Sequence, residues 1–213
     1  MNLAEQFGHI DIYLFDQLLK GRITQDMRIL DAGCGSGRNL VYFLRNGYTV
    51  FAVDRSEDAI HAVRNLGATL APGWSDEQAR VEEVERMSFA AESFDFVISN
   101  AVLHFAEDKA HFLQMIEELW RVLAPGGMLF IRLTSSIGIE DRIKPLGNQR
   151  YLLPDGSTRF LMDEEMMLET TAALKGTLFE PIKTVNVAGQ RCMSTWCIRK
   201  PLSRPPQGGS TAF

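Results

Sequence analysis

The chain has 213 residues and a formal net charge of -5, with 46% hydrophobic residues, which is the size and composition of one ordinary globular domain. Lysine and arginine are spread along the sequence, so the basic face that a phosphate backbone requires is not expected. Because no apolar run reaches the roughly 18 residues of a membrane span and no secretion signal begins the chain, we expect a cytoplasmic protein, monomeric or homodimeric, with neither nucleic acid nor membrane as partner.

The first predicted elements alternate between helix and strand. Apolar residues recur at helical spacing from His9 to Leu19, which predicts a helical cap within residues 1–27. MRILDA then reads as a strand, GRNLVYFLRNG as a helix, YTVFAVD as a strand and SEDAIHAVRNLG as a helix. Ser56 is the expected N-cap of that last helix and Gly67 its C-terminal stop. The alternation indicates βαβ units.

The middle of the chain continues this pattern after a polar loop at 68–80. VEEVE and FDFVISN are predicted strands, a helix is expected from about Lys109 to Leu123, and APGG leads into the strand MLFIRL. Strands that are apolar on both faces are typical of a parallel sheet covered by helices. The sequence therefore predicts a doubly wound α/β sandwich.

The last part of the chain has a different character. Residues 135–162 hold many turn formers and the hairpin YLLPDGSTRFL, which predicts an insertion over the sheet edge. A helix over DEEMMLETTAALKG, stopped near Gly176, precedes two antiparallel strands, EPIKTVNVA and RCMSTWCIRK. We expect a single domain over residues 1–201 and a disordered tail over 202–213. The cysteines form no CxxC pair, so reduced thiols and no metal site are expected.

Three glycines in ILDAGCGSGRN directly follow the first strand. Glycines at such a turn let the backbone approach a ligand without a Cβ in the way, and the helix N–H groups that follow favour a polar or anionic ligand. A dinucleotide site would need a further glycine where this chain has Arg38. The pattern therefore disfavours a nicotinamide cofactor.

Two carboxylates flank this turn. Asp54, at the end of the second strand, can accept hydrogen bonds from both ribose hydroxyls of any adenosine cofactor. Asp31, just before the glycines, would repel a pyrophosphate but suits a ligand that carries an ammonium and a sulfonium. That description fits S-adenosylmethionine. An NAD(P)-dependent oxidoreductase and a non-catalytic S-adenosylmethionine-binding protein remain as alternatives.

The segments ILDAGCGSGR, VFAVD, SFDFVISNAVLHF and LWRVLAPGGMLFIRL, in this order and spacing, resemble the class I S-adenosylmethionine-dependent methyltransferases of type 11/25. The similar region covers about residues 28–133. GCGSGRNLVYFLRNGYTVFAVD also resembles the bacterial tellurite-resistance methyltransferases. The resemblance implies a Rossmann-like fold with a seven-stranded, mostly parallel sheet in the order 3-2-1-4-5-7-6, strand 7 antiparallel, and helices on both faces.

The resemblance also implies where the cofactor, S-adenosyl-L-methionine, and its product S-adenosyl-L-homocysteine bind. The residues expected to shape the methionine pocket are Asp31, Gly33, Gly35 and Gly37. Asp54 would hold the ribose and Arg55 would border the adenine. Cys34 is a small residue of the turn, and Arg38 and Asn39 either contact the cofactor or solvate the first helical turn.

Two further strand ends complete the implied site. Counting back from Phe94 places the acid that meets the adenine amino group on Glu83, with Val84 after it and Glu85 as an alternative. The fourth strand ends in Ser99, Asn100 and Ala101, which would face the methionine part and the methyl group.

No catalytic residue is assigned from the sequence. Methyl transfer from a sulfonium is an in-line displacement that depends mainly on orientation, so a general base is not required. His104 and Tyr13 are the candidates, and packing is the alternative role of each. The sequence SNAV in place of an NPPY-type motif disfavours amino-group methylation on bases. A small-molecule acceptor is expected, with the N-terminal helix and the insertion as the candidate lid segments. Arg142, Arg150 and Arg159 of the insertion are candidates to meet an anionic acceptor, and simple surface exposure is the alternative.

Overall fold

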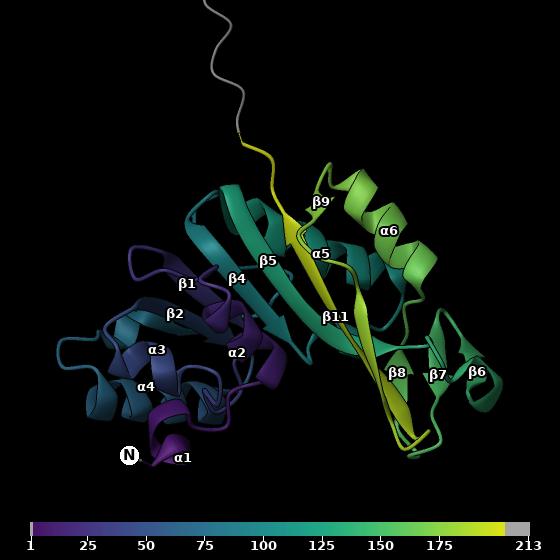
Figure 1. The fold of residues 1–213 in the computed structure, drawn as a ribbon, viewed down its shortest axis with the longest axis horizontal. Coiled ribbons are helices and arrows are strands. Elements are labelled where there is room, and N and C mark those ends of the chain that lie inside the picture. The colour runs from purple at the N-terminus through teal and green to yellow at the C-terminus, as the bar shows by residue number, and fades with distance from the viewer. Residues whose placement is uncertain (1, 203–213) are drawn as a thin grey trace, which may run out of the picture.

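The computed structural model describes residues 2–202, and its central element is a mixed β-sheet (Figure 1). The strands of its main path are β1 (Arg28–Ala32), β2 (Thr49–Asp54), β3 (Ala79–Val81), β4 (Phe94–Asn100), β5 (Leu123–Ser135), β10 (Lys183–Val187) and β11 (Arg191–Arg199). They are ordered β10-β11-β5-β4-β1-β2-β3. Strands β1 to β5 pair in parallel, whereas β11 is antiparallel to both β5 and β10. The seven-stranded order expected from the resemblance is therefore confirmed, and the short β9 (Thr177–Leu178) adds a further pairing with β11.

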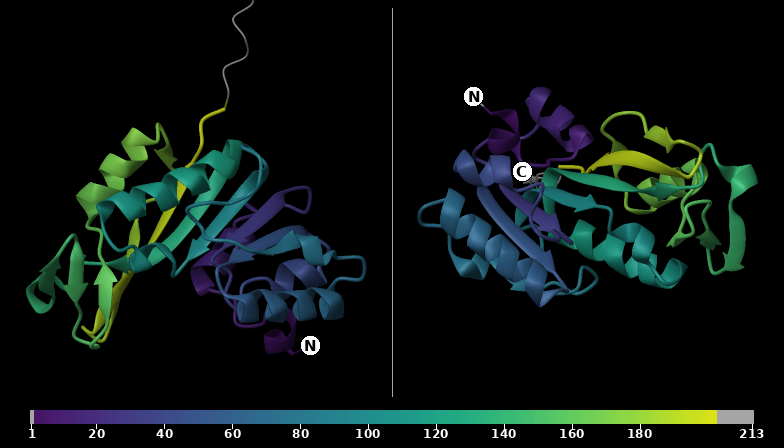
Figure 2. Two further views of the ribbon diagram at one scale, coloured as in Figure 1. Left: turned by 180° about the vertical axis from the view of Figure 1, so that it is seen from behind. Right: turned by 90° about the horizontal axis from the view of Figure 1, so that it is seen from below.

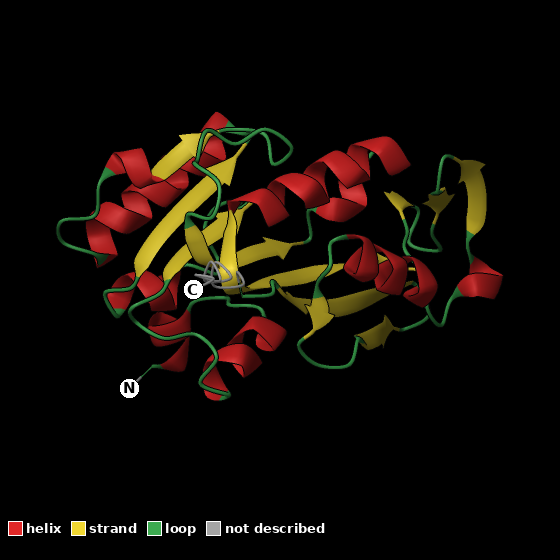
Figure 3. Ribbon diagram, turned by 90° about the horizontal axis from the view of Figure 1, so that it is seen from above, coloured by secondary structure: helices red, strands yellow, loops and turns green. Residues whose placement is uncertain are grey.

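Helices cover both faces of this sheet (Figure 3). On one face, α2 (Ile12–Leu19), α3 (Val41–Arg45) and α4 (Glu57–Leu70) pack over strand residues such as Ile29 and Phe96. On the other face, α5 (Lys109–Val122) and α6 (Glu164–Ala173) bury residues such as Val97 and Trp196. The view from behind in Figure 2 shows α5 lying across the sheet. Strands β1 and β4 are thus enclosed on both sides, which explains their nearly continuous apolar sequence.

Among the described residues, no helix combines the length and the apolar character needed to cross a membrane.

The amino-terminal α1 (Leu3–Phe7) is short, and the chain then enters α2 through its N-cap Asp11, whose side chain accepts from the N–H of Tyr13. The predicted cap helix is therefore confirmed from Ile12 onward.

Two helix predictions require correction. The helix expected over GRNLVYFLRNG forms only at Val41–Arg45, because residues 38–40 form turns after Gly37, which has φ +79°. Gly67 does not stop α4, which continues to Leu70. A Cβ at Gly67 would lie 2.1 Å from Cε3 of Trp74, so the glycine is needed for close packing inside the helix. Ser56 does cap α4, since its side chain accepts from the N–H of Ala59.

The third strand also differs from its prediction. Residues 76–78 form a 3-10 turn (η1, Asp76–Gln78), and β3 covers Ala79–Val81 rather than 81–85. The Glu82 N–H still donates to the Asp54 carbonyl, but the chain then turns back, with the Arg86 N–H donating to the Glu83 carbonyl. The tip of the third strand is therefore at residues 82–83.

The predicted insertion forms a small sheet of its own at the end of the molecule opposite α3 and α4 (Figure 1). After a turn at η3 (Glu140–Arg142), it consists of β6 (Lys144–Gly147), β7 (Arg150–Leu152) and β8 (Thr158–Phe160), in the order β6-β7-β8. The expected hairpin is the antiparallel pair β7 and β8. The β8 strand packs against η2 (Leu103–Phe105), and the Phe160 ring stacks on Phe112 of α5 at a centroid distance of 5.2 Å. Of the predicted tail, residues 203–213 lie outside the described part of the chain.

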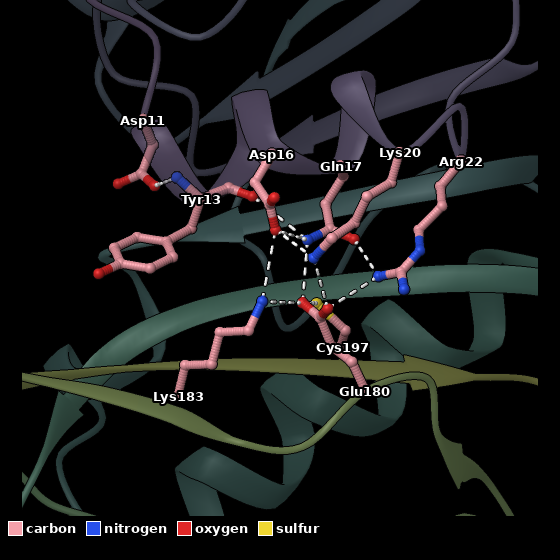
Figure 4. Close-up of polar contacts among 9 residues, drawn as sticks. All are labelled: Asp11, Tyr13, Asp16, Gln17, Lys20, Arg22, Glu180, Lys183 and Cys197. Carbon is pink, nitrogen blue, oxygen red and sulfur yellow. Dashed lines mark hydrogen bonds and ion pairs between the residues drawn. The ribbon is translucent and has the colours of Figure 1, made fainter.

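A cluster of charges joins α2 to the segment before β10 (Figure 4). The nearly buried carboxylate of Glu180 lies 2.8 Å from Lys20 Nζ, 3.0 Å from Arg22 Nη1 and 3.0 Å from Lys183 Nζ. Gln17 Nε2 donates to the same carboxylate at 3.0 Å. Burial alone would raise the pKa of Glu180, but the hydrogen bonds from Lys20, Lys183, Gln17 and Arg22 outweigh it and lower the pKa to about 2. This cluster fixes the N-terminal helix against the sheet.

Candidate functional site

A cavity of about 450 Å³ lies at the carboxyl ends of β1, β2 and β4. Ligands of doubly wound sheets bind at this edge, where the strand order reverses. The predicted cofactor residues that line the cavity are Gly33, Cys34, Gly35, Arg38, Asp54, Arg55, Glu83, Val84, Asn100 and Ala101. The structure thus brings together residues from four separate segments of the chain.

The glycine turn forms one wall of this cavity. The N–H groups of Gly33 and Cys34 both donate to the Val53 carbonyl, at 2.8 and 3.0 Å, which holds the turn against the end of β2. Gly33 has φ +79°, and a Cβ there would lie 2.4 Å from Cγ2 of Val102. Gly35 has φ +52°, and a Cβ there would meet nothing within 4 Å. Glycine at 33 is therefore required by both conformation and packing, and glycine at 35 by conformation alone.

The Asp54 carboxylate organises the turn from the opposite side. Its Oδ2 accepts from the Gly35 N–H at 2.8 Å, and its Oδ1 accepts from the Ser56 N–H at 2.9 Å. A carboxylate offers about four acceptor positions, so two remain for donors within the cavity. A pair of vicinal hydroxyls, such as those of a ribose, matches this remaining capacity.

Asp31 lies behind the cavity wall rather than in it. Its side chain is 1% exposed, and neither carboxylate oxygen has a hydrogen-bond partner within residues 2–202. Burial raises the pKa of Asp31 to about 7, with the Arg38 guanidinium opposing the rise and Asp54 adding to it. A buried, unpaired carboxylate is unfavourable until a cation approaches. This site therefore favours a positively charged ligand and opposes a diphosphate.

Another end of the cavity is formed by the loop after β3 and by α5. Glu83 and Val84 line it as expected, and so does the alternative acid Glu85. The Glu85 carboxylate lies 3.2 Å from Nε2 of His111, a residue that sequence reasoning missed. Because Nδ1 of His111 accepts from the Glu107 N–H at 3.2 Å, its Nε2 is assigned the proton that faces Glu85.

The end of β4 brings polar groups to the remaining side. Arg38 Nη2 donates to Asn100 Oδ1 at 3.2 Å, so two predicted residues are in contact. Ala101 adopts φ +62°, which turns the chain sharply after the strand. Asp11, the N-cap of α2, reaches this region from outside the predicted site, with Oδ2 at 3.1 Å from Arg132 Nε. Neither the N-terminal segment nor the insertion contributes a lining residue to the cavity within residues 2–202.

Two more of the predicted residues lie outside the cavity lining. Gly37 packs the turn against α4, since a Cβ there would lie 3.1 Å from side-chain carbons of Leu66 and Val63. Ser99 is fully buried, because neighbours along a strand point to opposite faces and Asn100 takes the cavity side. Both positions are structural neighbours of the site rather than part of its surface.

The two catalytic candidates do not line the cavity. His104 is 5% exposed, and its Nδ1 accepts from the Thr134 N–H at 3.1 Å. A neutral imidazole has one acceptor nitrogen, so this bond leaves none free to act as a base. Burial, with smaller effects of Arg159 and Arg191, lowers the pKa of His104 to about 4. The Arg132 guanidinium lies over the Tyr13 ring, with its Cζ 4.6 Å from the ring centroid. The geometry therefore assigns His104 a packing role and gives Tyr13 no contact with the cavity.

Several lining residues were not anticipated. These are Ser36, Val102, Phe105, His111 and Met115. Ser36 lies in the quoted glycine segment, and Val102 and Phe105 closely follow β4, so their position could have been predicted. Asn39, for which a cofactor contact is one expected role, also lines the cavity. His111 and Met115 are one helical turn apart on α5, but their direction toward the cavity depends on how that helix packs.

The fold and this site define a class I S-adenosylmethionine-dependent methyltransferase domain. Residues 30–131 match the family model described as "Methyltransferase domain". The 1,6-didemethyltoxoflavin-N1-methyltransferase of Burkholderia thailandensis, solved with S-adenosylhomocysteine, superposes with a TM-score of 0.68 at 20% identity, covering 94% of this chain and 81% of that one. S-adenosylmethionine is the cofactor of this class, so the nicotinamide alternative is set aside.

Sequence relatives agree on the domain but differ in substrate. The chain is 34% identical over 127 residues to the uncharacterized methyltransferase YodH of Bacillus subtilis, covering 60% of this chain and 48% of the relative. It is 29% identical over 139 residues to the tRNA 5-carboxymethoxyuridine methyltransferase of Escherichia coli, covering 64% and 51%. The chain thus spans about half the length of these relatives. Since one of them acts on tRNA, the expectation that nucleic acid is excluded is not supported by the comparisons.

Proposed function

We propose that the protein methylates a small-molecule acceptor, taking the methyl group from S-adenosylmethionine by direct in-line transfer. The observation that carries this proposal is the Asp54 carboxylate, whose Oδ2 accepts from the Gly35 N–H of the glycine turn and whose Oδ1 accepts from the Ser56 N–H. It keeps capacity for two hydroxyl donors in the cavity. Asp31, Asp54 and the glycine turn would hold the cofactor. The cofactor supplies an activated methyl group on sulfur.

The residues of this chain then have to orient the acceptor toward the methyl group and shield both from water. Asn100 and Ala101 line the cavity at the end of β4, where they would border the reacting methyl group. Phe105, next to them, is 54% exposed, and the Arg159 guanidinium of the insertion lies 4.9 Å from its ring centroid. The insertion therefore reaches the entrance through Phe105, which supports its role as a cover over a bound acceptor.

A small acceptor also agrees with the charge of the chain. The net charge of -5 would repel a polynucleotide unless local arginines outweighed it. A tRNA acceptor is the second candidate, because the Escherichia coli relative has that substrate.

The test is a product assay on the full chain. Purified protein and S-adenosylmethionine are incubated with a library of small metabolites and, separately, with total tRNA, and S-adenosylhomocysteine release is measured. We expect release with members of the metabolite library. Release with tRNA alone would replace the proposed acceptor class, and cofactor binding with no release for any acceptor would favour a non-catalytic binding protein.

A further inference from the structure

Two buried hydrogen-bond donors lie side by side at the end of β4, on and next to the cavity wall. Asn100 and Arg132 are register partners on the parallel strands β4 and β5, so both side chains leave the same face of the sheet about 5 Å apart. Asn100 is 8% exposed and lines the cavity, and the Arg132 side chain is 13% exposed. Neither Asn100 Nδ2 nor Arg132 Nη1 has a hydrogen-bond partner in the described part of the chain.

The other atoms of these two side chains are already engaged. Asn100 Oδ1 accepts from Arg38 Nη2 at 3.2 Å, which fixes the amide so that Nδ2 is the free end. Arg132 Nε faces Asp11 Oδ2 at 3.1 Å, and its guanidinium lies over the Tyr13 ring. The donors are therefore held in place by neighbours, and a ligand that used them would meet a preorganised pair.

The Arg132 guanidinium is only partly neutralised by its neighbours. Asp11 is shared by two guanidinium groups, since its Oδ2 also lies 3.8 Å from Arg38 Nη2. Within residues 2–202 neither arginine has another salt bridge. Arg38 is 47% exposed and also acts on the buried Asp31. Because Asp11 is shared, the Arg132 guanidinium, whose side chain is 13% exposed, has only part of one carboxylate as counter-charge. Buried charge of this kind is stable only with a counter-charge.

We propose that Asn100 Nδ2 and Arg132 Nη1 bind a carboxylate of the methyl acceptor, and that the acceptors of this protein are therefore carboxylic acids. This inference rests on the proposed function. The Arg38 side chain is 47% exposed and lines the cavity that would hold the cofactor. Arg132 lies on the next strand and does not line that cavity. A carboxylate also matches the planar guanidinium, which donates along two parallel directions.

The cofactor has a carboxylate of its own, so the experiment must separate the two sources. The full chain saturated with S-adenosylhomocysteine is titrated by calorimetry with acids and their neutral amides: malonate with malonamide, and benzoate with benzamide. The wild-type protein is expected to bind at least one acid more tightly than its amide. Arg132→Gln is expected to weaken that acid roughly tenfold to hundredfold and to leave the affinity for S-adenosylhomocysteine unchanged.

Arg199→Gln is the matched control. Arg199 lies at the opposite end of the sheet, paired in register with Met128 in the first half of the long strand β5, and the same charge change there should not alter acid binding. Retained binding of S-adenosylhomocysteine by Arg132→Gln shows that this variant is folded.

Several results would overturn the inference. If no acid binds better than its amide, or if Arg132→Gln keeps the acid preference, the donors do not select a carboxylate on the acceptor. If Arg132→Gln weakens S-adenosylhomocysteine but not methylthioadenosine, which lacks the amino acid, the donors hold the cofactor carboxylate instead. Failure of the wild-type protein to bind S-adenosylhomocysteine would contradict the proposed function itself, which is a separate outcome.

Discussion

The carboxylate of Asp54 accepts a hydrogen bond from the Gly35 N–H at 2.8 Å, which joins the end of the second strand to the turn after the first. The same carboxylate accepts from the Ser56 N–H and so also begins α4. One side chain therefore shapes the turn and faces the cavity. Cofactor binding and the local fold should depend on it together.

Asp54→Ala removes the acceptor atoms that face the cavity. We expect the affinity for S-adenosylhomocysteine to fall roughly tenfold to hundredfold, because hydrogen bonds to a charged group contribute about 1.5–3 kcal/mol. Calorimetric titration measures this change. Asp58→Ala, on the exposed first turn of α4, is the control and should bind normally. Unchanged binding by Asp54→Ala would show that this carboxylate does not contact the cofactor.

Gly33→Ala and Gly35→Ala should differ in stability. Both positions have positive φ, which costs an L-residue about 1–2 kcal/mol. At Gly33 the new Cβ would also collide with Val102, so we expect a loss of about 2–4 kcal/mol in the free energy of unfolding. At Gly35 the loss should stay near the roughly 1 kcal/mol of the backbone conformation alone, while cofactor affinity falls because the methyl group enters the cavity wall. Urea denaturation compares the two variants, and equal destabilisation would argue against the collision.

The buried Asp31 predicts a pH dependence. Its pKa of about 7 in the folded protein is raised from the ordinary value of 3.8, so the folded state holds the proton over a range where the unfolded state has lost it. Stability from this group is fully present below about pH 4 and is lost as the pH rises through about 7. Asp31→Asn should therefore be more stable than wild type above pH 7, with the difference shrinking toward pH 4.

Urea denaturation of both proteins across this range measures the effect. A constant difference between wild type and Asp31→Asn at all pH values would contradict the assigned titration. Because the Asn variant also removes the anion beneath the turn, it should bind S-adenosylmethionine more weakly than wild type at pH 8, despite its greater stability.

The Glu180 cluster predicts an opposite dependence. The pKa of Glu180 is lowered to about 2 from 4.5, so its contribution is present above pH 4.5 and is lost as the pH falls toward 2. Glu180→Gln leaves Lys20, Arg22 and Lys183 without their shared carboxylate (Figure 4). We expect a loss of about 2–4 kcal/mol at pH 7, measured by denaturation. Glu169→Gln, exposed on α6, is the matched control and should change stability by less than about 0.5 kcal/mol.

The features that the sequence predicted well are local or follow the strand ends. Alternating apolar strands and helices were sufficient for the doubly wound class, and the ends of β1, β2 and β4 placed Gly33, Asp54 and Asn100 around one cavity. These positions are fixed by the topology, because the carboxyl ends of parallel strands meet at one edge.

The features that were missed depend on contacts between distant segments. Gly67 was predicted to stop its helix because nothing in its local sequence shows that the Trp74 ring packs against it. Asp11 and Arg132 are far apart in the chain, and a single acid before a helix indicates only an N-cap. His111 shares its helix face with core residues, so periodicity could not separate a cavity residue from a packed one.

The most direct test of cofactor selection is a calorimetric titration of the full chain with S-adenosylmethionine, S-adenosylhomocysteine and NAD at neutral pH. We predict saturable binding of both adenosyl compounds, on the order of micromolar, and no heat with NAD, because a carboxylate beneath the turn opposes a diphosphate. Binding of NAD with no binding of the adenosyl compounds would contradict the claim that Asp31 and Asp54 form a site for a cationic adenosine cofactor.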